Sequence, residues 1–115
     1  FEGKEFEPKT RYSLLGTTMN YFIENSILEI PDYIKIDVDG IEHLILEGGN
    51  KFLSNKKVKS ISIEMSEKFE EQYNKILILM KKFNFDIINE KPNEDIFSKK
   101  NKSSKVYNYI FEKQK

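Results

Sequence analysis

Apolar residues recur along this chain with two different spacings, and each spacing predicts one kind of secondary structure. Five segments carry the alternating pattern or short apolar run that is typical of β-strands. They are residues 12–15, 33–38, 58–65, 85–88 and 106–111. The pattern is clearest where Ile34, Ile36 and Val38 alternate with polar residues and tyrosine. We therefore expect that segment to be a buried strand.

Three longer segments repeat apolar residues every three to four positions, which predicts amphipathic helices. They are residues 17–28, 40–53 and 69–83. Thr17 or Thr18 suits the N-cap of the first helix, and Pro31 is expected to end it. Asn84 follows the third helix and suits a left-handed C-cap.

The order of these elements predicts an α/β fold. Strands that alternate with helices of this length form right-handed crossovers and a parallel sheet, so 33–38 and 58–65 should be parallel neighbours. Residues 91–105 show no helical pattern, so the last two strands should form a long hairpin in which one strand is antiparallel. Residues 1–11 are polar and are expected to be a poorly ordered lead-in to a domain at 12–115.

Composition narrows the functional classes. Nineteen basic and nineteen acidic residues give a formal net charge of zero, which argues against binding nucleic acid or an anionic membrane. No apolar run approaches the roughly 18 residues of a membrane span. The chain has no cysteine, which excludes disulfides and is compatible with the cytoplasm. It begins with Phe1, so we expect it to be a piece of a longer polypeptide.

Asp37 is the first candidate for catalysis, because it stands at the carboxyl end of the strand 33–38. Open α/β proteins bind their ligands at that end of their strands. A carboxylate there can accept a proton from a hydroxyl group or bind a divalent cation. The structural alternative is an aspartate that hydrogen-bonds the following turn.

Three further carboxylates accompany Asp37. Asp39 and Glu42 have the spacing of a capping box, and the alternative is that they bind the substrate or share a cation with Asp37. Glu64 ends the strand 58–65 and should lie beside Asp37 if the two strands pair. Its functional alternatives are orientation of the acceptor and catalysis, and its structural alternative is to be a partner of Lys35 or of a nearby helix end. No spacing supports a defined metal site, since Gly40 is misplaced for an EF-hand loop.

The remaining chemistry-bearing residues are expected to face solvent. His43 is the only histidine and should lie away from the apolar stripe of its helix. The lysines of the predicted loop are Lys99, Lys100, Lys102 and Lys105, and contact with an anionic acceptor is their weaker alternative.

The run Ile34-Lys35-Ile36-Asp37-Val38-Asp39-Gly40-Ile41-Glu42 resembles the FkbM-type methyltransferases, a family that depends on S-adenosylmethionine. The resemblance continues through Ile45-Leu46-Glu47-Gly48 and through Val58 to Glu64, and covers roughly residues 12 to 90. The segment Leu15-Gly16-Thr17-Thr18-Met19 is similar to the family's threonine-leucine-aspartate segment, with Asn20 in place of the usual aspartate.

This resemblance implies a class I (Rossmann-like) methyltransferase with a seven-stranded doubly wound sheet. The strands predicted here correspond to its C-terminal half, mostly parallel with one antiparallel strand. The Gly-rich turn that holds the cofactor is missing, because Gly48-Gly49 follows a helix and not a strand. That pair should instead allow close packing or a kink.

The resemblance implies an O-methyltransferase that acts on a sugar or other glycan hydroxyl, with Asp37 and Glu64 as catalytic residues. The alternative is a non-catalytic α/β interaction or scaffolding domain. The expected partners are a small-molecule or glycan acceptor and, through the free edge of 33–38, segment 11–16, a second copy of the chain or the rest of the polypeptide.

Overall fold

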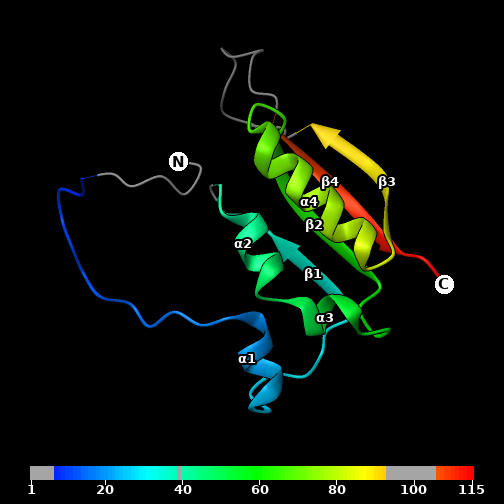
Figure 1. Ribbon diagram of the computed structural model, residues 1–115, viewed down its shortest axis with the longest axis horizontal. Coiled ribbons are helices and arrows are strands. Elements are labelled where there is room, and N and C mark those ends of the chain that lie inside the picture. The colour runs from blue at the N-terminus through cyan, green and yellow to red at the C-terminus, as the bar shows by residue number, and fades with distance from the viewer. Residues whose placement is uncertain (1–6, 39, 93–105) are drawn as a thin grey trace.

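A four-stranded sheet forms the centre of the computed structural model, which describes residues 7–38, 40–92 and 106–115. The strands are β1 (Tyr33–Ile36), β2 (Ser60–Ser66), β3 (Phe85–Pro92) and β4 (Val106–Lys113). Their order across the sheet is β1-β2-β4-β3 (Figure 1). β1 and β2 are parallel, and β4 is antiparallel to both β2 and β3. The predicted parallel pair and the single antiparallel strand are therefore confirmed.

The alternating sequence of β2 explains how the sheet acquires a buried face and a polar face. Ile61, Ile63 and Met65 are buried, whereas the residues between them are half-buried serines and a glutamate. In β4, Phe111 lies opposite Ile61 and Tyr109 lies opposite Ile63. A side-chain period of two brings these rings onto the same face as the isoleucines, where they form the core.

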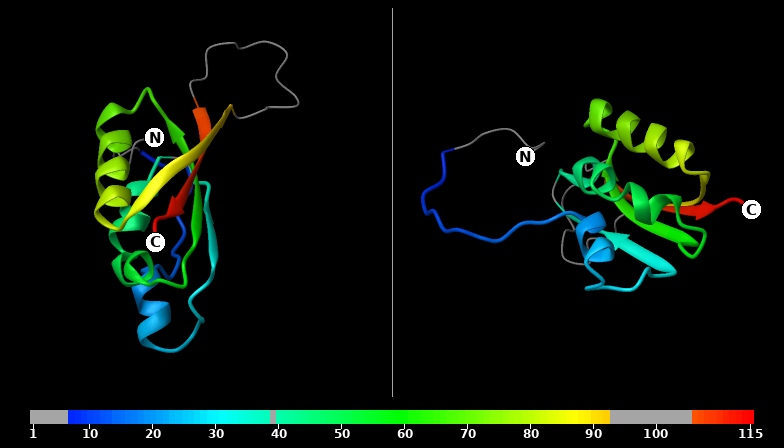
Figure 2. Two further views of the ribbon diagram at one scale, coloured as in Figure 1. Left: turned by 90° about the vertical axis from the view of Figure 1, so that its right-hand side faces the viewer. Right: turned by 60° about the horizontal axis from the view of Figure 1, so that its bottom comes forward.

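Four helices accompany the sheet: α1 (Met19–Glu24), α2 (Glu42–Glu47), α3 (Asn50–Ser54) and α4 (Glu70–Lys82). Figure 2 shows that α2, α3 and α4 cover the same face of the sheet. α4 buries Ile76 and Met80 against that face, as its helical stripe predicts. It ends at Lys82 with Phe83 as its C-cap, and Asn84 follows with φ 61°, so the predicted left-handed cap is confirmed.

The glycine pair divides the helix predicted at 40–53 into α2 and α3, and α1 packs against the break. A Cβ on Gly48 would lie 3.2 Å from Cβ of Thr18, and one on Gly49 would lie 3.0 Å from Sδ of Met19. Larger residues would therefore push the start of α1 away. Asn20 also donates a hydrogen bond from its backbone N–H to the Gly48 carbonyl, at 3.0 Å.

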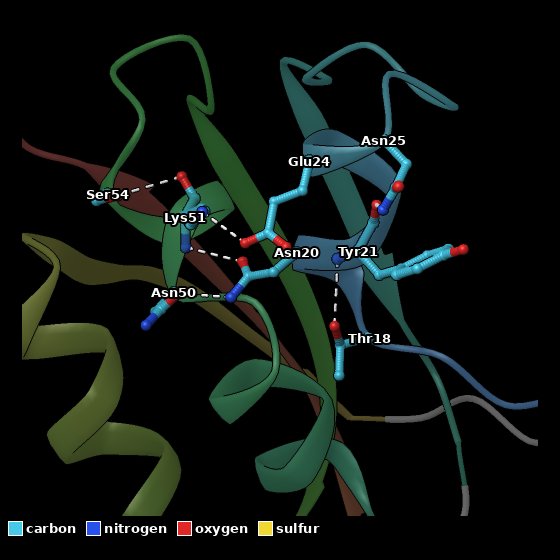
Figure 3. Close-up of polar contacts among 8 residues, drawn as sticks. All are labelled: Thr18, Asn20, Tyr21, Glu24, Asn25, Asn50, Lys51 and Ser54. Atoms are coloured by element: carbon cyan, nitrogen blue, oxygen red, sulfur yellow. Dashed lines mark hydrogen bonds and ion pairs between the residues drawn. The ribbon is translucent and has the colours of Figure 1, made fainter.

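Polar side chains join α1 to α3 (Figure 3). The Asn20 amide donates to Oδ1 of Asn50 at 2.6 Å, and its oxygen accepts from the Lys51 backbone N–H at 2.9 Å. Lys51 also forms an ion pair with Glu24 at 2.5 Å. Thr18 caps α1 as predicted, because its hydroxyl accepts from the Tyr21 backbone N–H at 3.2 Å. These contacts hold α1 against α3.

The structure corrects two expectations near the N-terminus. The predicted strand at 12–15 does not form, and Leu14 and Leu15 are exposed there. α1 ends at Glu24 and not near Leu28, because Ser26 adopts φ 54° and the Ile27 backbone N–H turns back to the Phe22 carbonyl. This is the Schellman arrangement, which the sequence concealed because serine occupies the usual glycine position.

A doubly wound sheet has helices on both faces. In the described residues, the helices packed on the sheet cover one face (Figure 2). The part of the fold prediction that concerns double winding therefore stays a prediction, as does the assignment to the C-terminal half of a larger domain.

Candidate functional site

A cavity of about 270 Å³ opens at the carboxyl ends of β1 and β2. Its walls come from the ends of these two strands, the start of α2, the first turns of α4 and the beginning of β4. The lining residues are Val38, Gly40, Glu42, Glu64, Met65, Ser66, Phe69, Gln72 and Val106. Two of the predicted site residues, Glu42 and Glu64, therefore belong to the cavity wall.

Asp37 lies beside this cavity and not in its wall. Its Oδ2 is 2.6 Å from Nζ of Lys35, which stands two positions earlier on the same side of the strand. The hydrogen bond from Lys35 lowers the pKa of the Asp37 carboxyl, although partial burial opposes the effect. Asp37 is therefore ionised at neutral pH and can accept a proton or a hydrogen bond.

Glu64 lies beside Asp37, as the predicted pairing of the two strands requires. Ile36 pairs with Ile63, so the next residue of each strand falls at the same level of the sheet. A hydrogen bond with Glu64 also lowers the pKa of Asp37. Glu64 also interacts electrostatically with Lys35, which was its predicted structural alternative.

Glu42 is a buried carboxylate, with 3% of its surface exposed. Its Oε1 accepts a hydrogen bond from the Gly40 backbone N–H at 3.4 Å, and its Oε2 accepts one from the Gln72 amide. Buried charged groups are rare unless such partners compensate for lost hydration. Glu42 therefore ties the turn after β1 to α4, across the floor of the cavity.

The predicted capping box is wrong in its register. α2 begins at Glu42 with Ile41 as its N-cap, and no side chain caps it. Glu42 is thus the first residue of the helix and not the third, and its carboxylate bonds the amide of Gly40. Gly40 has φ 92°, a conformation that favours glycine, because the chain must turn sharply between β1 and α2. Asp39, the other predicted member, lies outside the described residues.

Sequence reasoning missed Ser66, Phe69 and Gln72 as site residues. Phe69 was assigned to the apolar stripe of the helix, and Gln72 belongs to the region that resembles the family but was given no role in the site. Both line the cavity because α4 starts directly above the end of β2. The available signal was their spacing: residues three apart share a helix face, so Gln72 faces the same side as the half-buried Phe69.

His43 was predicted to be a solvated side chain, and the structure places it differently. It is half-buried, and its Nδ1 is buried without a hydrogen-bond partner among the described residues. It lines a second cavity of about 320 Å³ with Lys68, Lys75 and the acidic first turn of α4. The apolar stripe did not predict this position, because the start of α4 covers that side of α2.

The described residues form neither a metal site nor a membrane-spanning helix. Within residues 7–38, 40–92 and 106–115, no group of three or more histidine, cysteine or acidic side chains is arranged to hold a metal ion. The lysines at 99, 100, 102 and 105 lie outside these ranges. None of the helices that the structure describes has the length and apolar character needed to cross a membrane.

Comparison with known proteins identifies the family. Residues 5–87, more than half of the chain, match the methyltransferase FkbM domain. The chain therefore belongs to the FkbM methyltransferase family. The match includes β1, α2, β2 and α4 and ends at Ile87 in β3. No curated protein and no solved structure matches the chain.

Proposed function

We propose that this chain is part of an S-adenosylmethionine-dependent O-methyltransferase whose acceptor is a sugar or glycan hydroxyl. One observation carries the proposal: Asp37 and Glu64 lie side by side at the carboxyl ends of two parallel strands, beside a cavity. This is where α/β enzymes bind their substrates. Membership of a methyltransferase family supports the same class of reaction.

The proposed role of Asp37 follows from its charge state. An O-methylation would remove the proton of the acceptor hydroxyl while its oxygen bonds to the methyl carbon, whose bond to the sulfur of the cofactor would break and leave a neutral thioether. Asp37 is ionised at neutral pH, so its carboxylate can take that proton, although the lower pKa that Lys35 causes makes it a weaker base. Glu64 touches both Asp37 and the cavity, and we propose that it orients the acceptor through a hydrogen bond.

Glu42 and Asp39 complete the proposed acceptor site. The Glu42 carboxylate lines the cavity, where it can bind an acceptor hydroxyl and hold the cavity in shape. Asp39 is assigned to substrate binding by its position between Asp37 and Gly40 in the sequence. The cavity lies just below the range of about 300–1,000 Å³ that is usual for sites of small molecules.

The described residues do not fit a complete site for S-adenosylmethionine. The cavity beside Asp37 has room for one sugar-sized group and not for the whole cofactor as well. Gly48-Gly49 lies between two helices and is occupied by the start of α1, so it is not a cofactor loop. We therefore propose that another part of the polypeptide supplies that loop and that this chain is the C-terminal half of the domain. The antiparallel β4 between β2 and β3 supports this proposal.

A non-catalytic interaction domain is the second candidate, and a specific observation favours it. Tyr12, Leu14 and Leu15 have 78–102% of their surface exposed, in a segment that forms neither helix nor strand. Large exposed apolar side chains commonly mark a binding surface. Such a domain would need neither Asp37 nor a cofactor loop, so the two candidates differ in a measurable way.

Methyl transfer from labelled S-adenosylmethionine to a panel of glycans, catalysed by the full-length protein, tests the proposal. We expect Asp37→Asn to reduce turnover on the order of a hundredfold, because the amide cannot accept the hydroxyl proton. Asp86→Asn is the matched control, since Asp86 is exposed at the far end of the sheet. Equal activity of the two variants would remove the catalytic role of Asp37. No transfer by the wild-type protein to any glycan would favour the interaction domain.

A further inference from the structure

A cavity of about 950 Å³ lies at the opposite end of the sheet from Asp37 and Glu64. It is formed by the first residues of β1 and β2, the ends of α3 and α4, and the end of β4. Three separate segments bring lysines to its wall. These lysines are Lys56, Lys59, Lys82, Lys113 and Lys115, against one acidic lining residue, Glu112.

Two of the lysines have structural partners. Nζ of Lys113 donates to the carbonyls of Leu53 and Asn55, at the end of α3, and lies 4.7 Å from the centre of the Phe85 ring. Lys59 forms an ion pair with Asp32 at 2.7 Å. Lys113 therefore fixes the wall of the cavity, and Asp32 neutralises Lys59.

The other three lysines leave the cavity with an excess of positive charge. Lys56, Lys82 and Lys115 form no ion pair with any residue that the structure describes. Nζ of Lys82 lies over the Phe83 ring, 5.5 Å from its centre, which positions the ammonium group near the wall. The whole chain has no net charge, so this excess is a local separation of charge and not a general basic character.

We infer that this cavity is a second binding site, for a small molecule that carries phosphate groups. Lysine ammonium groups bind phosphate as point charges, and three that lack carboxylate partners can contact the oxygens of one or two phosphates. The volume matches a whole small molecule. Ser54, Ser60 and Asn84 also line the wall and offer hydrogen bonds to an uncharged part of that molecule. A nucleic acid fits less well, because the charge is confined to one concave site.

Amide NMR of the full-length protein tests the inference with three probes: pyrophosphate, ADP and glucose 1-phosphate. We expect saturable shifts at the amides of Ser60, Asn84 and Gln114, which line the cavity. Tighter binding of ADP or of glucose 1-phosphate shows that the ligand is an organic phosphate. Tighter binding of pyrophosphate shows that the site takes free phosphate. No shift at these amides with any probe overturns the inference.

A matched pair of variants separates a site from net charge. Lys56→Gln with Lys82→Gln should weaken binding of the best probe at least tenfold. Lys57→Gln with Lys81→Gln removes the same charge one residue away, from side chains that do not line the cavity, and should change binding less than twofold. All four side chains are exposed, so both variants should fold. An equal loss in both variants would contradict a site in the cavity.

Discussion

At the scale of single residues, the two polar pairs of the site differ in their exposure to water. Lys35 and Asp37 have 63% and 45% of their side chains exposed, so solvent screens their ion pair and its contribution to stability is small. Glu42 is buried, and its bond from Gln72 cannot be replaced by water as readily. Lys35 therefore acts mainly on the pKa of Asp37, whereas the hydrogen bond from Gln72 to Glu42 ties α4 to the turn after β1.

Lys35→Met should raise the pKa of Asp37 towards its ordinary value of 3.8, because the hydrogen bond from Lys35 is the main cause that lowers it. A carboxyl with a lowered pKa stabilises the fold above its unfolded pKa, and that contribution disappears as pH falls through the folded pKa. The stability difference between wild type and variant should therefore vanish in acid. Carboxyl ¹³C titration measures the pKa, with Lys51→Met as the control. An unchanged Asp37 midpoint would show that Lys35 does not set it.

Gln72→Met should destabilise the protein by about 2 kcal/mol, because it removes a hydrogen bond from a buried carboxylate and keeps the size of the side chain. Gln114→Met is the same substitution at an exposed position and should have little effect. Urea denaturation at neutral pH compares the two variants. Equal midpoints would mean that Glu42 finds other partners.

The positions of Asp37 and Glu64 were predictable from sequence, and the partner of Glu42 was not. The apolar run before Asp37 marked a strand end, and strand pairing then placed Glu64 beside it. The contact between Glu42 and Gln72 spans 30 positions and depends on how α4 crosses the sheet. The Asn20 bridge is similar, because its amide both donates and accepts, which an aspartate could not do.

At the scale of elements, sequence pattern succeeded where packing is regular. The apolar stripe of α4 and the alternation of β2 matched their predictions, because each buries one face against the sheet. The prediction of a strand at 12–15 was wrong, because a strand needs a neighbouring strand to pair with and a local sequence pattern does not show whether one is present. Residues 40–53 divided into two helices because a close contact with α1 falls at the glycine pair.

Gly40→Ala should destabilise the turn between β1 and α2 by about 1–2 kcal/mol, because φ 92° is unfavourable for a residue with a Cβ. Gly16→Ala is the control, since its added Cβ meets nothing within 4 Å and its φ is not positive. Thermal unfolding of both variants gives the comparison. A destabilisation in Gly16→Ala as large as in Gly40→Ala would refute the conformational argument.

At the scale of the whole molecule, the sheet has an unusual edge. β1 pairs with β2 on one side, and no described residue pairs with its other side. Segment 11–16 was one predicted partner, and that prediction is wrong because the segment forms no strand. β3, the opposite edge, has a register shift between Ile87 and Asn89 and ends at Pro92, features that discourage further pairing. β1 has no comparable irregularity.

We therefore predict that a strand from the rest of the polypeptide, or from a second copy, pairs with β1 in the full-length protein. Hydrogen exchange should then be slow throughout residues 33–36, including the amides that point away from β2. Light scattering distinguishes the two partners, because only pairing with a second copy gives a dimer. Exchange in the exposed edge of β3 is the internal control. A monomer whose β1 amides exchange as fast as those of the β3 edge would show that β1 has no partner. That result would contradict the proposal that this chain is the C-terminal half of a larger domain.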